Sequence, residues 1–271
     1  MTAGGALLTQ PNTPSAVGPL SPWTRVKRAI ARRVRRPAAQ DGPTYRGAFP
    51  THAAAMAAVR PHMLAGYDHD EVAPIAFERM CQVTLWDYPV LFWLDRLLPG
   101  TTRLIDAGGH MGTKFRAFRK HLNLPAGFDW TVYDVPAIVR AGRARAQRDG
   151  LTGISFYEKL EETPPADLLL CSGLLQYLDI PFADLIARLP VKPRHIILNK
   201  VATRAGPTVV TLEGFGTAEI PYQVRDHAEF LGALEALGYT LEDAWTIPEL
   251  SRSHPTFGFS TSRGFYARQR S

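Results

Sequence analysis

The chain has 271 residues, is 45% hydrophobic and carries a formal net charge of +6 at pH 7, which suits one sizeable α/β domain with an accessory segment. Its apolar runs fall short of the roughly 20 residues that a membrane span needs, and no early apolar segment resembles a secretory signal, so we expect a cytoplasmic protein. The charge does not indicate a nucleic-acid partner, because the surplus of arginine and lysine lies before Asp41.

Residues 1–43 are expected to form an arm and a linker. Residues 1–22 are rich in Pro, Gly, Thr and Ser and have too few apolar side chains to fold, so we expect disorder there. Between Trp23 and Arg36, apolar residues recur every three or four positions among arginines, as in a basic amphipathic helix. This helix is either a peripheral contact with an anionic membrane or a solvated basic arm.

Residues 44–99 predict a helical cap ahead of the main domain. An alanine-rich stretch runs from His52 to Val59, and a second helical segment runs from Val72 through Leu98. Three aromatic side chains of this segment are either walls of a substrate pocket or ordinary core residues. These three are Tyr45, Tyr67 and Trp86.

From residue 100 to 271 strands and helices alternate. Strands are expected near residues 103–107, 130–134, 154–157, 167–171 and 195–199. This pattern predicts an α/β protein with a Rossmann-like, doubly wound and mainly parallel sheet. A loop around Gly206–Gly216 and a helix over Asp226–Leu237 follow. Two late strands, Tyr239–Thr246 and Arg263–Arg268, joined by a loop over Ser251–Ser262, would complete a seven-stranded sheet with an antiparallel edge.

The strand ends at Asp106 and Asp134 are the most informative feature of the sequence. An apolar run ends at Asp106 and turns on glycines, and the next run ends at Asp134, as in a βαβ unit that holds a nucleotide-sized ligand. A carboxylate at Asp106 would repel the pyrophosphate of a dinucleotide, which counts against a nicotinamide-dependent oxidoreductase. It could instead accept from the amino-acid end of S-adenosylmethionine, while Asp134 binds the ribose hydroxyls.

Short motifs spread from Tyr45 to the C-terminus carry a family resemblance. They are Tyr45-Arg-Gly-Ala-Phe-Pro50, Gly66-Tyr-Asp68, Tyr88-Pro-Val-Leu91, Asp106-Ala-Gly-Gly109, Asp134-Val-Pro136, Ser172-Gly-Leu-Leu-Gln-Tyr-Leu178 and Gly238-Tyr239. Together they resemble class I, Rossmann-like S-adenosylmethionine-dependent methyltransferases. More narrowly, the chain resembles the methyltransferase family of the LIC12133 type.

This resemblance implies that S-adenosylmethionine is the cofactor and assigns residues to each part of it. Asp106, Gly108, Gly109 and Gly112 would flank the methionine moiety, Asp134 would bind the ribose, and Val135 would pack on the adenine. Tyr157 and Glu158 would touch the adenine from the third strand. Ser172 and Gly173 would lie beside the point of methyl transfer.

The resemblance also places Gln176 where related small-molecule O-methyltransferases have a histidine base. An amide is not a useful base at neutral pH, so Gln176 and Tyr177 would orient a small-molecule or glycan-linked acceptor, methylated at oxygen. The candidate bases are histidines: His110, His227 and His254. His254 lies in a loop that could fold over the site. His110 faces either the pocket or solvent, with solvent the expected side.

Other chemistry fits the sequence less well. The spacing of His, Cys, Asp and Glu indicates no metal site, and Cys81 and Cys171 lie in apolar contexts typical of free thiols. Asn199 and Lys200 face the ligand side by topology, where they would bind an acceptor or cap the strand. The leading hypothesis is a methyltransferase that works by SN2 displacement. The alternative is a catalytically degenerate protein of the same fold that acts as a binding module.

Overall fold

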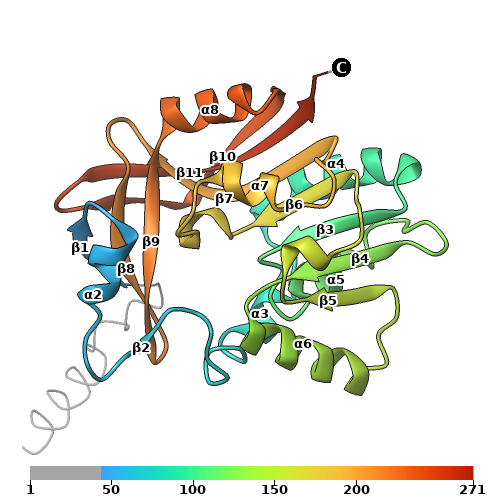
Figure 1. Cartoon of the computed structure of the whole chain (residues 1–271), viewed down its shortest axis with the longest axis horizontal. Helices are drawn as coiled ribbons and strands as arrows, with labels where there is room; N and C mark the ends of the chain where they lie inside the picture. Colours follow the sequence, from blue (N-terminus) through green and yellow to red (C-terminus); the bar gives the residue numbers. More distant parts are fainter. Residues whose placement is uncertain (1–43, 271) are drawn as a thin grey trace, which may run out of the picture. The chain divides into compact units, whose positions relative to one another are not determined.

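The structure is a computed structural model that describes residues 44–270 (Figure 1). The predicted disorder of residues 1–22, the amphipathic helix Trp23–Arg36 and the linker that follows it lie outside the described residues. They stay predictions. Among the residues described, no helix is both long enough and apolar enough to cross a membrane.

A mainly parallel sheet carries the described part of the chain. Its strands are β3 (Arg103–Ala107), β4 (Asp129–Tyr133), β5 (Ile154–Tyr157), β6 (Leu168–Ser172), β7 (His195–Arg204), β10 (Tyr239–His254) and β11 (Gly258–Gln269). These seven lie in the order β5-β4-β3-β6-β7-β11-β10, and β11 runs antiparallel to both of its neighbours. The predicted doubly wound, mainly parallel sheet with a late antiparallel edge is therefore confirmed.

Helices cover both faces of this sheet (Figure 1). One apolar cluster includes residues of α4 (Tyr88–Leu97), α5 (Thr113–Phe118) and α6 (Pro136–Arg148), and another includes residues of α7 (Phe182–Ala187) and α8 (His227–Ala236). Neighbouring residues of one strand divide between them: Leu104 joins the first cluster and Ile105 the second. Side chains alternate along a strand, so a run that is apolar at every position suits a strand buried on both faces.

The region predicted as a loop around Gly206–Gly216 is a β-hairpin, and that prediction was wrong. Strands β8 (Val209–Phe215) and β9 (Ala218–Asp226) pair antiparallel. The turn between them contains Gly216 at a φ of +59°. The β-branched run at the start of β8 favours a strand, and the glycines near its end mark the turn of the hairpin.

The segment predicted as a helical cap also contributes strands. The prediction was wrong for β1 (Thr44–Phe49), which pairs antiparallel with β8, and for β2 (Leu64–Ala65), which pairs parallel with β9. Helix α2 (His52–Ala57), helix α3 (Phe77–Met80) and α4 form its helical part, with 3-10 turns η1 (Leu85–Asp87) and η2 (Leu98–Gly100). Two further 3-10 turns, η3 (Leu160–Glu162) and η4 (Leu175–Tyr177), follow β5 and β6.

The loop predicted over Ser251–Ser262 is also mostly strand. Strands β10 and β11 continue to pair until His254 lies opposite Gly258. The late strands are thus longer than expected, because cross-strand hydrogen bonds carry them through a sequence rich in serine and glycine.

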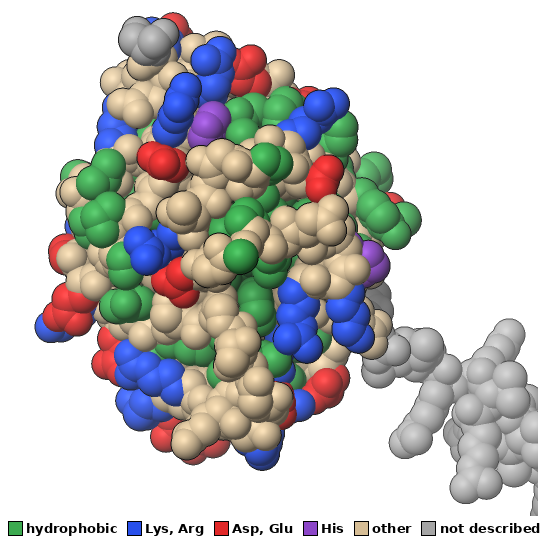
Figure 2. All heavy atoms as spheres, turned by 90° about the vertical axis from the view of Figure 1, so that its right-hand side faces the viewer, with side chains coloured by type: hydrophobic (Ala, Val, Ile, Leu, Met, Phe, Trp, Pro, Cys, Tyr) green, Lys and Arg blue, Asp and Glu red, His purple; other side chains and the backbone are tan. Residues whose placement is uncertain are grey.

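Charges of both signs are distributed over the folded body. Figure 2 shows Lys and Arg side chains interspersed with Asp and Glu on the face that includes the right-hand side of Figure 1. This distribution agrees with the nearly balanced charge of the sequence after residue 41.

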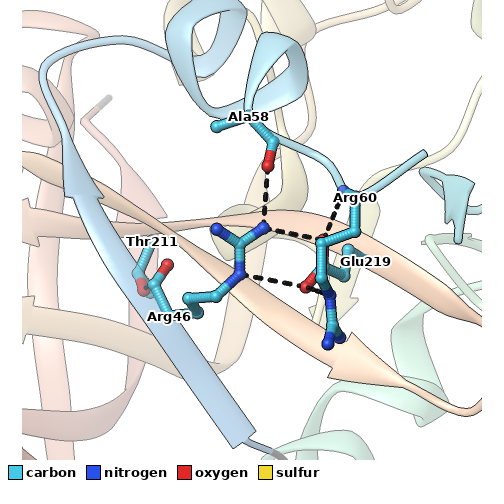
Figure 3. A network of polar contacts seen from close by, with 5 residues as sticks. All are labelled: Arg46, Ala58, Arg60, Thr211 and Glu219. Atoms are coloured by element: carbon cyan, nitrogen blue, oxygen red, sulfur yellow. Dashed lines mark hydrogen bonds and ion pairs between the residues drawn. The ribbon is translucent and has the colours of Figure 1, made fainter. Parts of the chain in front are cut away.

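Glu219 of β9 ties β1 to the segment that follows α2 (Figure 3). Its carboxylate is 2% exposed. It accepts from Arg46 Nε at 3.1 Å and Nη2 at 2.8 Å, and from Arg60 Nε at 2.8 Å and backbone N at 2.9 Å. Arg46 also donates to the Ala58 carbonyl at 2.7 Å. One buried carboxylate therefore organises the junction of three segments.

We expect Glu219→Gln to lower the free energy of unfolding by about 2 kcal/mol at pH 7. The hydrogen bonds from Arg46 lower the pKa of Glu219 from 4.5 to about 2. Because the folded pKa is depressed, the carboxylate stabilises the fold above about pH 4.5, and this contribution is lost as the pH falls towards 2. In urea unfolding, the gap between variant and wild type should therefore shrink over that range. A gap that stays constant with pH contradicts the assignment, and exposed Glu249→Gln serves as the control.

Candidate functional site

Two adjoining cavities lie at the carboxyl ends of β3, β4 and β6. Their volumes are about 320 Å³ and about 190 Å³, and both are lined by Tyr67, Gly108, Asp134, Leu174 and Tyr177. The chain leaves β3 towards β4 on one side and returns to β6 on the other, so the cavities lie where the strand order reverses. Open α/β sheets bind ligands at this position. We call these the first cavity and the second cavity.

The turn after β3 depends on its glycines. Gly108 and Gly112 have φ values of +72° and +73°, which favour glycine. A Cβ on Gly108 would lie 2.8 Å from Leu174 Cβ, and one on Gly112 would lie 2.5 Å from Ile154 Cδ1. A Cβ on Gly109 would lie 2.7 Å from the Asp106 carboxylate. The turn can therefore pack only without side chains, and of its glycines Gly108 lines the cavities.

Asp134 follows β4 and lines both cavities. Its Oδ2 accepts from the backbone N–H of His110 at 2.8 Å, and its Oδ1 accepts from the N–H of Val135 at 2.8 Å. Burial raises its pKa to about 6, against the effect of these two bonds. Each carboxylate oxygen has two lone pairs, so both oxygens can still accept from a ligand hydroxyl.

Asp106 lies beneath the turn and lines neither cavity. It is fully buried, and its Oδ2 accepts from Trp130 Nε1 at 3.0 Å. Its Oδ1 has no partner among residues 44–270, and burial raises its pKa to about 7. The carboxylate thus packs under Gly109, and its predicted direct contact with a ligand stays a prediction.

The predicted adenine contacts separate in the structure. Val135 lines the first cavity, but Tyr157 and Glu158 line neither. The Tyr157 carbonyl accepts from the backbone N–H of Asp134 at 3.3 Å, while Glu158 is exposed and pairs with Arg143. The strand end was located correctly, but neither side chain lines a cavity.

The residues expected near methyl transfer do meet in the second cavity, which is lined by Ser172, Gly173, Gln176 and Tyr177. Gln176 is buried, and its Oε1 has no partner within the described chain. Tyr177 donates to Glu213 Oε2 at 2.5 Å. This bond fixes the direction of the Tyr177 ring at the cavity wall.

The candidate histidines lie in different places. His110 is 9% exposed and lines the second cavity, so the expectation that it faces solvent was wrong: its φ of +56° accompanies a side chain turned inward. Burial lowers its pKa to about 4, which keeps the ring neutral at pH 7. His254 stacks on Phe257 at the tip of the β10–β11 hairpin, and His227 begins α8. Neither of these two lines a described cavity at the strand ends.

No family model matches the chain, and no curated protein matches it. Among solved structures, the N-terminal domain of EvdMO1, crystallised in the presence of SAH and D-fucose, matches with a TM-score of 0.50 and 16% identity over 69% of this chain and 84% of that chain. The fold is the Rossmann-like fold of class I methyltransferases. The narrower resemblance to the LIC12133 type stays a prediction.

Two further solved structures are similar at lower scores. The 1,6-didemethyltoxoflavin-N1-methyltransferase of Burkholderia thailandensis has a TM-score of 0.48 and 21% identity, over 69% of this chain and 79% of that chain. The magnesium protoporphyrin IX methyltransferase of Synechocystis has a TM-score of 0.45 and 18% identity, over 72% and 93% of the two chains.

Several cavity residues come from outside the seven strands of the class I methyltransferase fold. Phe215 of β8 lines the second cavity, and Ile220 and Pro221 of β9 line the first. Sequence reasoning missed them because it read β8 and β9 as a loop. It did name Tyr67, which lines both cavities, whereas Tyr45 and Trp86, named beside it, line neither.

Lys114 was also missed. It lines the second cavity and forms a buried ion pair with Asp87 at 2.7 Å. A lysine in the first turn of a helix opposes the helix dipole, and that anomaly was the available signal. Among the described residues, no group of three or more His, Cys, Asp or Glu is placed to hold a metal ion.

Proposed function

We propose that the chain is an S-adenosylmethionine-dependent methyltransferase that acts at oxygen on a small-molecule or glycan-linked acceptor. The observation that carries this proposal is Asp134. It is a partly buried carboxylate whose oxygens can accept further hydrogen bonds, on the wall shared by two cavities at the switch point of a class I methyltransferase fold.

The residues present fit such a ligand. Gly108 allows the β3 turn to approach Leu174, so no side chain from the turn fills the space there. Val135, Leu178 and Ile180 supply apolar surface for the adenine ring in the first cavity, and Asp134 can accept from ribose hydroxyls. The second cavity adjoins the first through shared residues, as an extended ligand with a nucleoside end and an amino-acid end requires.

When bound, S-adenosylmethionine supplies a methyl group on a positively charged sulfur, ready for displacement. The protein's task is to hold the acceptor oxygen in line and to exclude water. Tyr177, held by Glu213, and the buried amide of Gln176 are the orienting groups on the acceptor side. The EvdMO1 domain was crystallised with SAH and a sugar, which supports an acceptor of this kind.

Calorimetric titration of S-adenosylmethionine and S-adenosylhomocysteine tests the proposal. We expect micromolar binding to the wild-type protein, weakened about tenfold in Asp134→Asn, because the amide loses the charge that strengthens a hydrogen bond to ribose. Exposed Asp95→Asn is the matched control and should bind like wild type.

Other outcomes point to other functions. Folded protein that binds neither ligand would favour the catalytically degenerate reading, in which the fold serves as a binding module. Tight binding of NAD in a parallel titration would revive the oxidoreductase reading. Equal affinity of wild type and Asp134→Asn would remove Asp134 from the site.

A further inference from the structure

Strand β7 loses its regular pairing with β11 at Asn199 and Lys200. Leu198 lies opposite Phe265 of β11 and Val201 opposite Arg263, so two residues of β7 face one of β11, as in a β-bulge. Lys200 has a φ of +62°, a left-handed conformation that costs a non-glycine residue about 1 to 2 kcal/mol. Such strain persists where the surroundings hold it, and it is concentrated at functional sites.

The surroundings hold this bulge through Asn199, which is 1% exposed. Its Nδ2 donates to the Trp86 carbonyl at 3.1 Å, and its Oδ1 accepts from Trp245 Nε1 at 3.1 Å. Gly264, opposite the bulge, makes room for Trp245, since a Cβ there would lie 1.9 Å from the indole. Asn199 is thus fixed from two sides, and the next side chain along, Lys200, lines the second cavity.

The amine of Lys200 lies close to the predicted transfer point. A Cβ on Gly173 would be 3.9 Å from Lys200 Nζ, and Gln176 lines the same cavity. Lys114, the other lysine of this cavity, is paired with Asp87. Lys200 Nζ takes part in no hydrogen bond or ion pair within residues 44–270, so the amine is available to a molecule bound in the cavity.

The groups around Lys200 include some that lower its pKa and some that raise it. Burial lowers its pKa to about 7, and the neighbouring ammonium of Lys114 adds to this, while the carboxylates of Asp87 and Asp106 oppose it. Asp134 and His110 also line the cavity, and His110 is neutral at pH 7 because burial lowers its pKa to about 4. Together these groups favour the uncharged amine of Lys200 more than water would favour it for an exposed lysine.

We propose that Lys200 is the general base that takes the proton from an acceptor hydroxyl in the second cavity, a role that rests on the proposed methyltransferase function. The acceptor oxygen forms the new bond to the methyl carbon, and the carbon–sulfur bond breaks with its electron pair left on sulfur. The hydroxyl proton passes to Lys200 Nζ, which becomes an ammonium. The acceptor atom is thus a hydroxyl oxygen, and the base that Gln176 cannot supply comes from the fifth strand of the sheet.

The charge of the methyl donor favours proton transfer in this direction. A sulfonium bound in the same cavity disfavours the ammonium form of Lys200, which keeps the amine neutral before transfer. After transfer the sulfur is uncharged, and the ammonium becomes favourable again. The base therefore strengthens as the methyl group leaves.

A carbon-13 NMR titration tests the role directly. The chain has six lysines, so protein labelled at lysine Cε gives few signals, and Lys200 is assigned by the signal lost in Lys200→Arg or, if that variant does not fold, in Lys200→Met. We expect Lys200 to titrate near neutral pH, well below the ordinary lysine value of about 10.4. With S-adenosylmethionine bound, its midpoint should be lower than with S-adenosylhomocysteine by about one pH unit or more. Exposed Lys159 should not respond to either ligand.

Three results would overturn the inference. Lys200 could titrate together with the exposed lysines, or it could titrate at the same midpoint in both complexes although calorimetry shows that both ligands bind. In these two cases the general base is wrong and the methyltransferase function stands. If neither ligand binds the folded protein, the proposed function fails first and the role of Lys200 fails with it.

Discussion

Asp87→Ala is expected to lower the free energy of unfolding by about 3 to 5 kcal/mol, because it leaves the ammonium of Lys114 buried without its partner. Asp87 is fully buried and Lys114 is 6% exposed, with 2.7 Å between Asp87 Oδ1 and Lys114 Nζ. The other oxygen of Asp87 accepts from Thr84 N at 3.0 Å and Oγ1 at 2.7 Å, so the start of α4 loses its anchor as well. Urea unfolding at pH 7 measures the effect.

The double variant Asp87→Ala/Lys114→Met identifies the cause. It should be less destabilised than Asp87→Ala alone, because removing both charges leaves no unpaired ion in the core. Arg188→Ala, which breaks the exposed pair with Glu161, is the surface control and should change stability by less than about 1 kcal/mol. A double variant that loses as much stability as Asp87→Ala and Lys114→Met lose in sum would show that the pair is not coupled.

Gly108→Ala is expected to lower the free energy of unfolding by about 2 to 4 kcal/mol, from the left-handed backbone and from the contact with Leu174 together. The new Cβ would lie 2.8 Å from Leu174 Cβ, which is the rigid base of that side chain. Relief requires Leu174 to move, and Leu174 lines both cavities. Affinity for S-adenosylmethionine should therefore fall about a hundredfold, since the ligand must reverse a displacement worth about 2 to 3 kcal/mol.

Gly150→Ala separates the two causes. Gly150 has a φ of +60° and open space around its Cα, so alanine there should cost about 1 to 2 kcal/mol of stability and leave ligand affinity unchanged. In Gly108→Ala/Leu174→Gly the contact with the Cβ of residue 174 is removed, and part of the lost affinity should return. Unchanged binding in Gly108→Ala would mean that the turn is not in the binding path.

The sequence was sufficient to locate Asp134, Ser172 and Gly173 at one place. Apolar runs mark the buried strands, and the carboxyl ends of parallel strands meet at one edge of a sheet, so the residues that follow them come together. The sequence does not determine which of the side chains beyond such an end reach the cavity. Tyr157 ends β5 but lines neither cavity, whereas Arg188, which follows α7 and no strand, lines the first cavity.

The conformation of Lys200 is a second feature that the sequence alone does not predict. Its conformation follows from a mismatch in pairing with β11 and from the bonds of Asn199 to Trp86 and Trp245, residues remote in the chain. The β8–β9 hairpin was missed for a local reason. Glycines are typical of loops as well as of hairpin turns. Only the pairing of β8 with β9 and with β1 shows that this segment is a hairpin.

The bond between Tyr177 and Glu213 has a consequence for where the protein can be shortened. Glu213 also accepts from the hydroxyl of Tyr45 at 2.7 Å, so the first described strand supports a wall of the second cavity through one shared carboxylate. A shortened protein that starts after Phe49 would lack that donor as well as the pairing of β1 with β8. Any deletion meant to remove only the basic arm must therefore end before Thr44, or it changes the cavity along with the arm.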